Sequence, residues 1–533
     1  MATALWRFAE VEAVYQRLRP LSPYGRRSAE RRTILTDPAE LDRRYDRVDA
    51  MRTLLADEAE TADRVRYHLK RIPRLPLATE IATAADLFLV KKFLVNSKAL
   101  AGCLPEAARA LFGLSWQSDA LLQALDTEDR GEETFYLADR CSGELAAIRA
   151  EIRQLDTELQ ALRSATLDAL QTNHGLDFQH RDFLVIDHAR AEPFGSDEVY
   201  LEPFDSRHVI VRPVLPKQHF TMLTQREALL SRERQAEQAV LATMAATVRE
   251  HEAVLAAYVR VIEAIDLALA AATLAQSLDM TRPELQASPA AIEIIDGRLI
   301  PLQENCADQQ LDYRPLTATL ETPHGLLHGS NMTGKSVVLK TVSALQILAQ
   351  LGLFVPARQF RTVVFDRMSF IGTSGTDEAR GLSGFGQEMV DLRRAIHERG
   401  RLSLFIIDEF ARTTNSREAA ALIAGLLHWL DGTDGTCSLL ATHYTELPAF
   451  ERVRRWQMKG VDWEQLSAEA AMPAEDLAAR IKAINRCVPH EMIADSDEPA
   501  AHDAIRIAEK LGLDDVIVTF ARGQLGAGSA EFE

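Results

Sequence analysis

The stretch Gly329-Ser-Asn-Met-Thr-Gly334-Lys335-Ser336 fits the phosphate-loop pattern GxxxxGK[ST]. Glycines at both ends let the backbone curl so that N–H groups point at phosphate oxygens, and a following helix adds its positive end. Lys335 would contact the β and γ phosphates, and the Ser336 hydroxyl is a ligand for Mg²⁺. We expect ATP to be held by Gly329, Ser330, Asn331, Met332, Thr333, Gly334, Lys335 and Ser336.

An acidic pair downstream would turn binding into hydrolysis. The apolar run 402–407 is typical of a buried strand, and Asp408 and Glu409 follow it directly. Asp408 is expected to hold Mg²⁺, directly or through water, and Glu409 to accept a proton from the attacking water. Such a pair alone is as often a solvated turn, but beside a phosphate loop it predicts an ATPase.

His443 completes the candidate catalytic residues together with Lys335 and Glu409. It follows the apolar run CSLLAT, so it would stand at the end of another strand. From there it could reach the γ phosphate and report its presence, although a histidine in such a place is more often structural.

These residues can meet only if strands bring them to one edge of a sheet. After Pro283 short β runs alternate with amphipathic stretches, which predicts a mostly parallel sheet covered by helices. The runs are GLLHG, FRTVVFD, LSLFIIDE and CSLLATH. We therefore expect an α/β domain over residues 286–460, with a C-terminal helical segment over 461–533.

The first half of the chain predicts helices. Residues 1–130 have apolar residues at helical spacing, which indicates an all-α domain. Two long amphipathic stretches follow within 131–285, from Leu145 and from about Thr224, typical either of an antiparallel coiled-coil arm or of ordinary bundle helices. Between them, residues 174–224 are Pro-rich and β-branched and predict a small strand-containing tip. This tip has five Lys or Arg against eight Asp or Glu, so it is not a basic grip for nucleic acid.

Bulk composition narrows the class of protein. A chain of 533 residues predicts two to four domains. It has no apolar run long enough to cross a bilayer and no secretory signal, so we expect no membrane association. The five cysteines lack metal or disulfide spacing, which suggests reduced thiols in a cytoplasm. The net charge of −18 is mild evidence against DNA binding, although a local basic groove is compatible with it.

Four blocks in this order resemble the ATPase domain of the MutS family of DNA mismatch-repair proteins: GSNMTGKS, LAQLGLFVPAR, DEFARTTNSREA and ATHYTEL. The segment 381–389 resembles the signature segment of that family, and the two long helices match the place of its lever arms. The resemblance implies a P-loop ABC-type ATPase domain after an all-α core and lever domain. It also implies a dimer in which Ser383 contacts the γ phosphate bound by the other subunit; a helix N-cap is the alternative for Ser383.

Two departures from the family pattern stand out, together with one match that lacks its context. Ala411, Thr413 and Ala419 replace glycines in DEFARTTNSREA, so coupling between the two sites of a dimer is expected to be altered. The core-like segment begins near residue 20, so we expect the mismatch-reading and connector domains to be absent. The triplet Phe8-Ala9-Glu10 matches the family's mismatch wedge in letters, but it has no domain to carry it, which favours coincidence.

The sequence leaves two classes of client for the ATPase: DNA, or another protein. The commoner role of the family implies a homodimer or a heterodimer with a related chain, whose arms enclose DNA in mismatch repair or recombination. Truncated members that reactivate adenosylcobalamin-dependent aminomutases imply instead a protein-remodelling factor, which the acidic tip and the net charge favour. A scaffold without turnover is disfavoured because Lys335, Ser336, Asp408 and Glu409 are all present.

Overall fold

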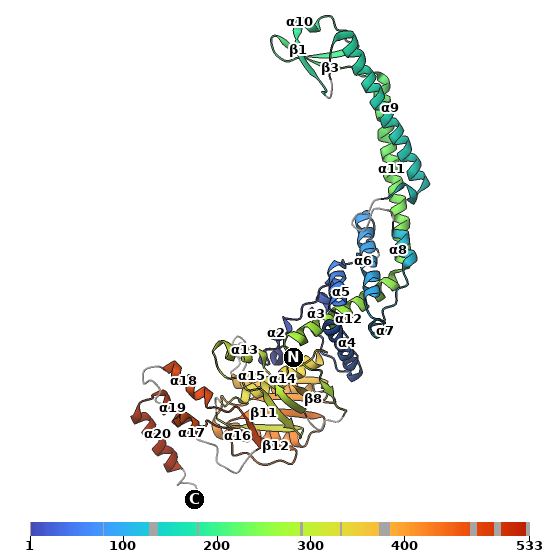
Figure 1. Ribbon diagram of the computed structural model, residues 1–533. Helices are drawn as coiled ribbons and strands as arrows, with labels where there is room; N and C mark the ends of the chain where they lie inside the picture. The colour runs from blue at the N-terminus through green and yellow to red at the C-terminus, as the bar shows by residue number, and fades with distance from the viewer. Residues whose placement is uncertain are drawn as a thin grey trace. The chain divides into compact units, whose positions relative to one another are not determined.

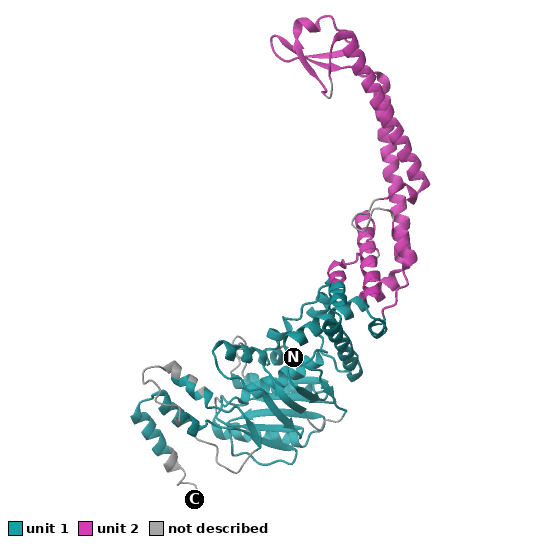
Figure 2. Cartoon of the chain, viewed as in Figure 1, with its two compact units in different colours: residues 1–66, 104–113, 261–533 teal, residues 67–103, 114–260 magenta. Residues whose placement is uncertain are grey.

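The chain forms two compact units, which Figure 2 shows in teal and magenta. The larger unit comprises residues 1–66, 104–113 and 261–533, and the smaller unit comprises residues 67–103 and 114–260. The predicted four-part division is finer than this one and stays a prediction. This computed structural model describes residues 2–77, 79–126, 137–178, 181–287, 292–330, 333–372, 384–468, 477–494 and 503–528.

The N-terminal region is helical, as predicted. Within the larger unit, Tyr45 donates a hydrogen bond to the carbonyl oxygen of Ala349 (2.7 Å), and the Leu35 amide donates to that of Gln350 (2.7 Å). Both acceptors lie at the end of α14 (Lys335–Gln350), so this region is anchored to the helix that follows the phosphate loop. The helices are α1 (Ala2–Phe8), α2 (Val11–Tyr15), α3 (Pro23–Glu30), α4 (Pro38–Asp57), α5 (Ala59–Arg71) and α7 (Glu106–Phe112).

The triplet Phe8-Ala9-Glu10 has a structural role. Phe8 stacks on Phe370, with ring centroids 4.2 Å apart, and Glu10 forms an ion pair with Lys340 of α14. Ala9 between them is buried. All three side chains are therefore engaged inside the larger unit, in agreement with a coincidental match to a mismatch wedge.

A mostly parallel sheet lies in the C-terminal part of the chain (Figure 1). Among the described residues six strands pair in the order β13-β12-β7-β11-β10-β9, all parallel except the edge pair β12–β13. Strands β10 and β11 are buried along nearly their whole length, as continuous apolar runs between covering layers should be. The strands are β7 (His324–His328), β9 (Arg367–Gly372), β10 (Ser403–Asp408), β11 (Thr436–Thr442), β12 (Val453–Met458) and β13 (Met492–Ala494).

A second sheet corrects one expected strand. The run 360–366 was expected to be one strand of the main sheet, but only its start is strand, and it pairs in the other sheet, of order β4-β8-β5-β6. The main sheet uses β9 instead, where charged and polar residues interrupt the apolar pattern. The strands of the second sheet are β4 (Glu284–Leu285), β5 (Ile292–Gly297), β6 (Leu316–Leu320) and β8 (Gln359–Thr362).

Helices complete the larger unit. Apolar residues of α15 and α16 pack with β10 in one buried cluster that includes Phe405, Ile423 and Leu427. A separate buried cluster holds the C-terminal helices, with Leu466, Ile484 and Ile507. The helices are α12 (Glu252–Ser277), which begins in the smaller unit, α13 (Ile300–Asp308), α15 (Gly384–His397), α16 (Ser416–Asp431), α17 (Trp463–Ala468), α18 (Leu477–Arg486), α19 (Asp503–Leu511) and α20 (Asp515–Gly528).

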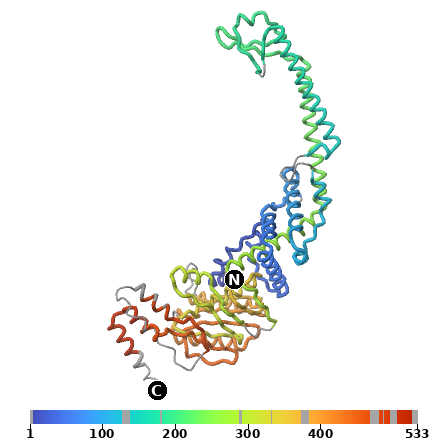
Figure 3. The backbone as a smooth tube through the Cα atoms, viewed as in Figure 1, coloured from blue at the N-terminus to red at the C-terminus, as the bar shows by residue number. Residues whose placement is uncertain are grey.

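Two long helices dominate the smaller unit, and the tube in Figure 3 follows them to a tip. The predicted apolar seam of α9 is buried against α11 at Leu145, Ile148 and Ile152. The returning helix begins earlier than the predicted start near residue 224, and it is interrupted at His251, whose Nδ1 lies 2.9 Å from the Thr247 carbonyl oxygen. The helices are α6 (Ala84–Cys103), α8 (Asp119–Leu125), the 3-10 helix η1 (Asp139–Cys141), α9 (Gly143–His174) and α11 (Lys217–Glu250).

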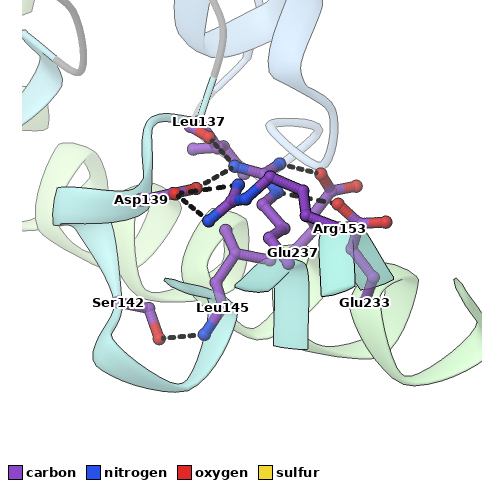
Figure 4. Close-up of polar contacts among 8 residues, drawn as sticks. Leu137, Asp139, Ser142, Leu145, Arg153, Glu233 and Glu237 are labelled. Atoms are coloured by element: carbon purple, nitrogen blue, oxygen red, sulfur yellow. Dashed lines mark hydrogen bonds and ion pairs between the residues drawn. The ribbon is translucent and has the colours of Figure 1, made fainter. Parts of the chain in front are cut away.

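A buried arginine fastens the base of this helix pair. Arg149 of α9 is 6% exposed, and its guanidinium forms ion pairs with Glu233 and Glu237 of α11, both at 2.7 Å. It also pairs with Asp139 at 3.2 Å and donates to the Leu137 carbonyl oxygen (Figure 4). A buried charge needs this many partners, because removing it from water is costly.

The predicted strand-containing tip is present. Three antiparallel strands pair in the order β1-β3-β2 over a small core that includes Leu170, Phe178 and Val211. The other face of the sheet carries exposed Phe183, Val185 and Tyr200. The elements are β1 (Leu184–Asp187), α10 (His188–Ala191), β2 (Val199–Pro203) and β3 (His208–Pro213). Among all the described helices, none is both long and apolar enough to cross a membrane.

Candidate nucleotide site

The phosphate loop joins a buried strand to the start of a helix. Strand β7 ends at His328, and α14 begins at Lys335 with Gly334 as its N-cap. Gly334 has φ +99°, and a Cβ there would lie 3.1 Å from Nδ1 of His490; Gly329 has φ +153°. Both positions therefore require glycine, as the sequence pattern predicts. Asn331 and Met332 of this loop lie outside the described residues.

Lys335 points back into its own loop. Its side chain is 4% exposed, and Nζ donates to the carbonyl oxygens of Gly329 (2.8 Å) and Ser330 (3.1 Å). Burial lowers the pKa of Lys335, while the nearby charges of Glu409 and Asp408 act in the opposite direction. The ammonium group of Lys335 therefore lies at the phosphate loop, near the carboxylates of Asp408 and Glu409. At this position it is available to bind an anion.

Ser336 and Asp408 form the oxygen pair predicted for Mg²⁺. The Ser336 hydroxyl donates to Oδ1 of Asp408 at 3.1 Å, which joins the first turn of α14 to the end of β10. Burial raises the pKa of Asp408, the hydrogen bond from Ser336 lowers it, and the charge of Glu409 raises it again. A cation there would favour the ionised carboxylate. Within the described ranges no group of three His, Cys, Asp or Glu side chains is arranged to hold a metal.

Glu409 begins a tight turn after β10. Its amide donates to the carbonyl oxygen of Ala441 (3.0 Å), and its carboxylate pairs with Arg412 at 2.9 Å. Glu409 has φ +48° and Ala411 has φ +61°, a left-handed conformation that costs residues other than glycine about 1 kcal/mol or more. Ala411 occupies one of the positions where the resembling family has glycine, so the turn keeps its conformation without that glycine.

A buried carboxylate of α15 holds this turn. Glu388 is 2% exposed, and its Oε2 accepts a hydrogen bond from the Ala411 amide at 2.8 Å. Its other oxygen, Oε1, is buried without a hydrogen-bond partner in the described part of the chain. Burial raises the pKa of Glu388, and the Ala411 hydrogen bond and the Arg412 charge lower it. No role for Glu388 was predicted from the sequence, since a Glu within an amphipathic helix normally faces solvent.

His443 lies directly after β11, one strand over from Glu409. Loss of solvent around its ring lowers the pKa of His443, the Glu409 charge raises it, and the charges of Lys335 and Arg412 lower it. Its ring packs on Tyr444 with centroids 4.2 Å apart. The structure therefore places His443 within electrostatic reach of Lys335 and Glu409. Ser383, predicted to act in the other subunit's site, lies outside the described residues.

Part of the predicted set meets at one cavity of about 680 Å³, which Gly334 also lines but Gly329, Ser330 and Thr333 do not. Lys335, Ser336, Asp408 and Glu409 line it together with Arg412, whereas His443 does not. Other lining residues were missed because they come from distant segments without a recognisable motif. They include Asn305, Cys306, Leu311, Tyr313, Arg314, Met458, Arg486 and His490.

Comparisons with known proteins show where the sequence resembles others. A family model described as MutS domain V matches residues 325–488. A DNA mismatch repair protein MutS from Anaeromyxobacter sp. (strain K) is 35% identical over 199 residues, covering 36% of this chain and 22% of that protein. The protein of the same name from Geobacillus kaustophilus (strain HTA426) is 26% identical over 449 residues, covering 78% of this chain and 48% of that protein.

The match is partial on both sides. A third relative of the same name, from Bacillus subtilis (strain 168), is 31% identical over 182 residues, covering 34% of this chain and 21% of the relative. The chain thus spans between about a fifth and a half of these three relatives. The range of the family model includes the segments that contain Lys335, Asp408 and Glu409. Residues 325–488 of the chain are therefore similar to MutS domain V, and the similarity to MutS proteins covers only part of each relative's length.

Proposed function

We propose that this chain is a Mg²⁺-dependent ATPase of the P-loop, ABC type, which hydrolyses ATP in the cavity at the start of α14. The observation that carries the proposal is that Lys335, Ser336, Asp408 and Glu409 line one cavity, although they come from two separate segments of the chain. A phosphate-binding loop beside a paired Asp and Glu supplies what phosphoryl transfer to water needs: charge, a metal ligand and a base. The cavity volume of about 680 Å³ is in the range of small-molecule sites.

Each residue would act on a different part of the reaction. Lys335 would hold β and γ phosphate oxygens, which would take the place of the loop carbonyls that it now contacts. Glu409 would accept the proton of the attacking water, with Arg412 fixing the orientation of its carboxylate. His443, whose pKa is lowered, would be neutral at physiological pH and so available to hydrogen-bond near the γ phosphate.

The oxygens of Ser336 and Asp408 fit Mg²⁺. They lie 3.1 Å apart at the junction of α14 and β10, and Mg²⁺ prefers hard oxygen ligands and completes its shell with water and phosphate. When bound, the ion would neutralise phosphate charge. The chain's own contribution is to hold the two oxygens on rigid elements, the first turn of a helix and the end of a buried strand.

Phosphate release by the full chain tests the ATPase. Lys335→Ala should lower turnover by about two orders of magnitude, because the charge that stabilises the transferring phosphoryl group is lost. Lys459→Ala is the matched control, since Lys459 is exposed and lies outside the cavity. Equal rates for Lys335→Ala and the unaltered protein would refute the assignment of the loop.

For the client, DNA is the first candidate, with clamp-like motion of the helical arms of a dimer. It is supported by the curated relatives, each of which is named a DNA mismatch repair protein. Binding of duplex and four-way-junction DNA should weaken as salt rises, with an affinity that ATP changes. If neither DNA binds at about 50 mM salt, where phosphate contacts are strongest, the DNA proposal fails.

A protein client is the second candidate, as in ATP-dependent reactivation of an adenosylcobalamin-dependent aminomutase. It is favoured by the tip, where Tyr200 and Phe204 are each 60% exposed on a segment with more acidic than basic residues. An exposed aromatic face with acidic surroundings suits a protein surface better than a phosphate backbone. Tyr200→Ser with Phe204→Ser should weaken binding to such a client and leave basal ATP hydrolysis unchanged; DNA binding lost in this variant instead would favour DNA at the tip.

A further inference from the structure

We propose that Glu388 is a positioning residue that fixes the turn bearing Glu409, and so links helix α15 to the hydrolytic step. This inference rests on the proposed ATPase function and adds a residue to it. Glu388 does not line the cavity itself; its Oε2 accepts a hydrogen bond from the backbone amide of Ala411 at 2.8 Å.

The turn that begins at Glu409 needs stabilising contacts from outside the turn, because its own backbone conformation is unfavourable. Glu409 and Ala411 both have positive φ, at 48° and 61°. Inside the turn, the Arg412 amide donates to the Glu409 carbonyl oxygen at 3.3 Å, and the Thr414 amide donates to that of Ala411 at 3.1 Å. The Ala411 amide points instead toward α15, where Oε2 of Glu388 is its acceptor.

Burying the Glu388 carboxyl reduces the stability of the folded state, which indicates that this residue is present for function. A carboxyl that is 2% exposed, on a helix whose Phe385 and Met389 pack against a buried apolar cluster, loses most of its hydration. One of its oxygens has no partner among the residues that the structure describes. An apolar side chain there would pack without that loss, but it would leave the Ala411 amide without an acceptor.

The consequence is a mechanical link between two parts of the site. Glu388 lies five residues after Ser383, the residue expected to reach the partner subunit's γ phosphate. A shift of α15 would move the acceptor of the Ala411 amide and thereby the Glu409 carboxylate two residues away. Glu388 would thus let the position of α15 control whether Glu409 is set to accept the water proton.

Three variants test this in the full-length protein. Glu388→Met removes the acceptor while filling a similar volume, and we expect kcat to fall by about tenfold or more with an ATP Kd changed by less than about twofold. Glu388→Gln keeps an acceptor oxygen and should retain most of the turnover. Glu398→Met, just beyond the end of α15, is the control for the change of residue type and should behave like the unaltered protein, because Glu398 is exposed.

A fourth variant separates positioning from simple destabilisation. Ala411→Gly removes the penalty of the left-handed backbone, so adding it to Glu388→Met should recover turnover several-fold. Unchanged kcat in Glu388→Met would overturn the proposal. So would a loss of kcat accompanied by an equal loss of ATP affinity and of thermal stability, with no recovery by Ala411→Gly. If the unaltered protein is no faster than Lys335→Ala, the ATPase function itself fails and the inference fails with it.

Discussion

His324, a residue of β7, connects the stability of the larger unit to pH. Its side chain is 0% exposed, with Nδ1 3.0 Å from the Ser438 hydroxyl of the neighbouring strand. Burial, and secondarily the charge of Arg452, lower the pKa of His324 from 6.5 to about 4. The folded protein therefore excludes a proton that the unfolded chain accepts below about pH 6.5, so stability is complete above that pH and is lost as pH falls toward 4.

Because of His324, we expect the free energy of unfolding to fall by about 3 kcal/mol between pH 6.5 and pH 4. His324→Gln should flatten the decline of the thermal unfolding midpoint of the larger unit between pH 6.5 and 4. The exposed His428 on α16 gives a matched control, His428→Gln, which should leave the decline as it is. A His324→Gln protein with an undiminished decline would show that other groups govern acid unfolding.

At the level of elements, the base of the arm depends on one buried charge. Arg149→Met would leave Glu233 and Glu237 without this partner and should destabilise the α9–α11 pair by about 1–3 kcal/mol, since both carboxylates are partly exposed to water. Hydrogen exchange along both helices would measure the loss, while basal ATP hydrolysis should not change. Arg153→Met is the control, because the side chain of Arg153 is 63% exposed and it shares only Asp139 with Arg149. Equal exchange in both variants would contradict a stabilising role of the buried arginine.

The sequence predicted some elements well and others poorly, for physical reasons. Strands β10 and β11 and helix α14 were predictable because a buried parallel sheet requires continuous apolar runs, and a phosphate loop requires glycines. Strand β9 was missed because Arg367 and Ser369 break its apolar pattern. Glu388 lies in the segment 381–389 that resembles the family signature, but its role was missed because its partner is a backbone amide in a turn further along the chain, which no spacing rule detects. The cavity wall from Tyr313, Arg486 and His490 was equally invisible, since only folding brings these residues together.

At the level of the whole molecule, the proposed dimer should depend on bound ATP. Glu409→Gln removes the proton acceptor but keeps Lys335 and Ser336, so ATP should stay bound without hydrolysis and favour the two-chain form. Light scattering after size exclusion should show a larger mass with ATP for Glu409→Gln but not for Lys335→Ala. If Glu409→Gln stays monomeric in the presence of ATP, the prediction of a nucleotide site shared by two chains is contradicted.

Helix α20 offers an apolar surface for such association, through its exposed side chains Val516, Ile517 and Phe520.

The contact of Arg149 with two acidic residues has a consequence for how an arm could move. Glu233 and Glu237 are one helical turn apart on α11, so sliding α11 along α9 by about 5–6 Å would exchange one carboxylate for the other. At intermediate positions the buried guanidinium of Arg149 would lie between Glu233 and Glu237 without a well-placed acceptor on α11. The two helices would then have two preferred registers, one helical turn apart, and would move between them in a single step. Spin labels on the two helices should accordingly report separate distance populations and not a continuous spread.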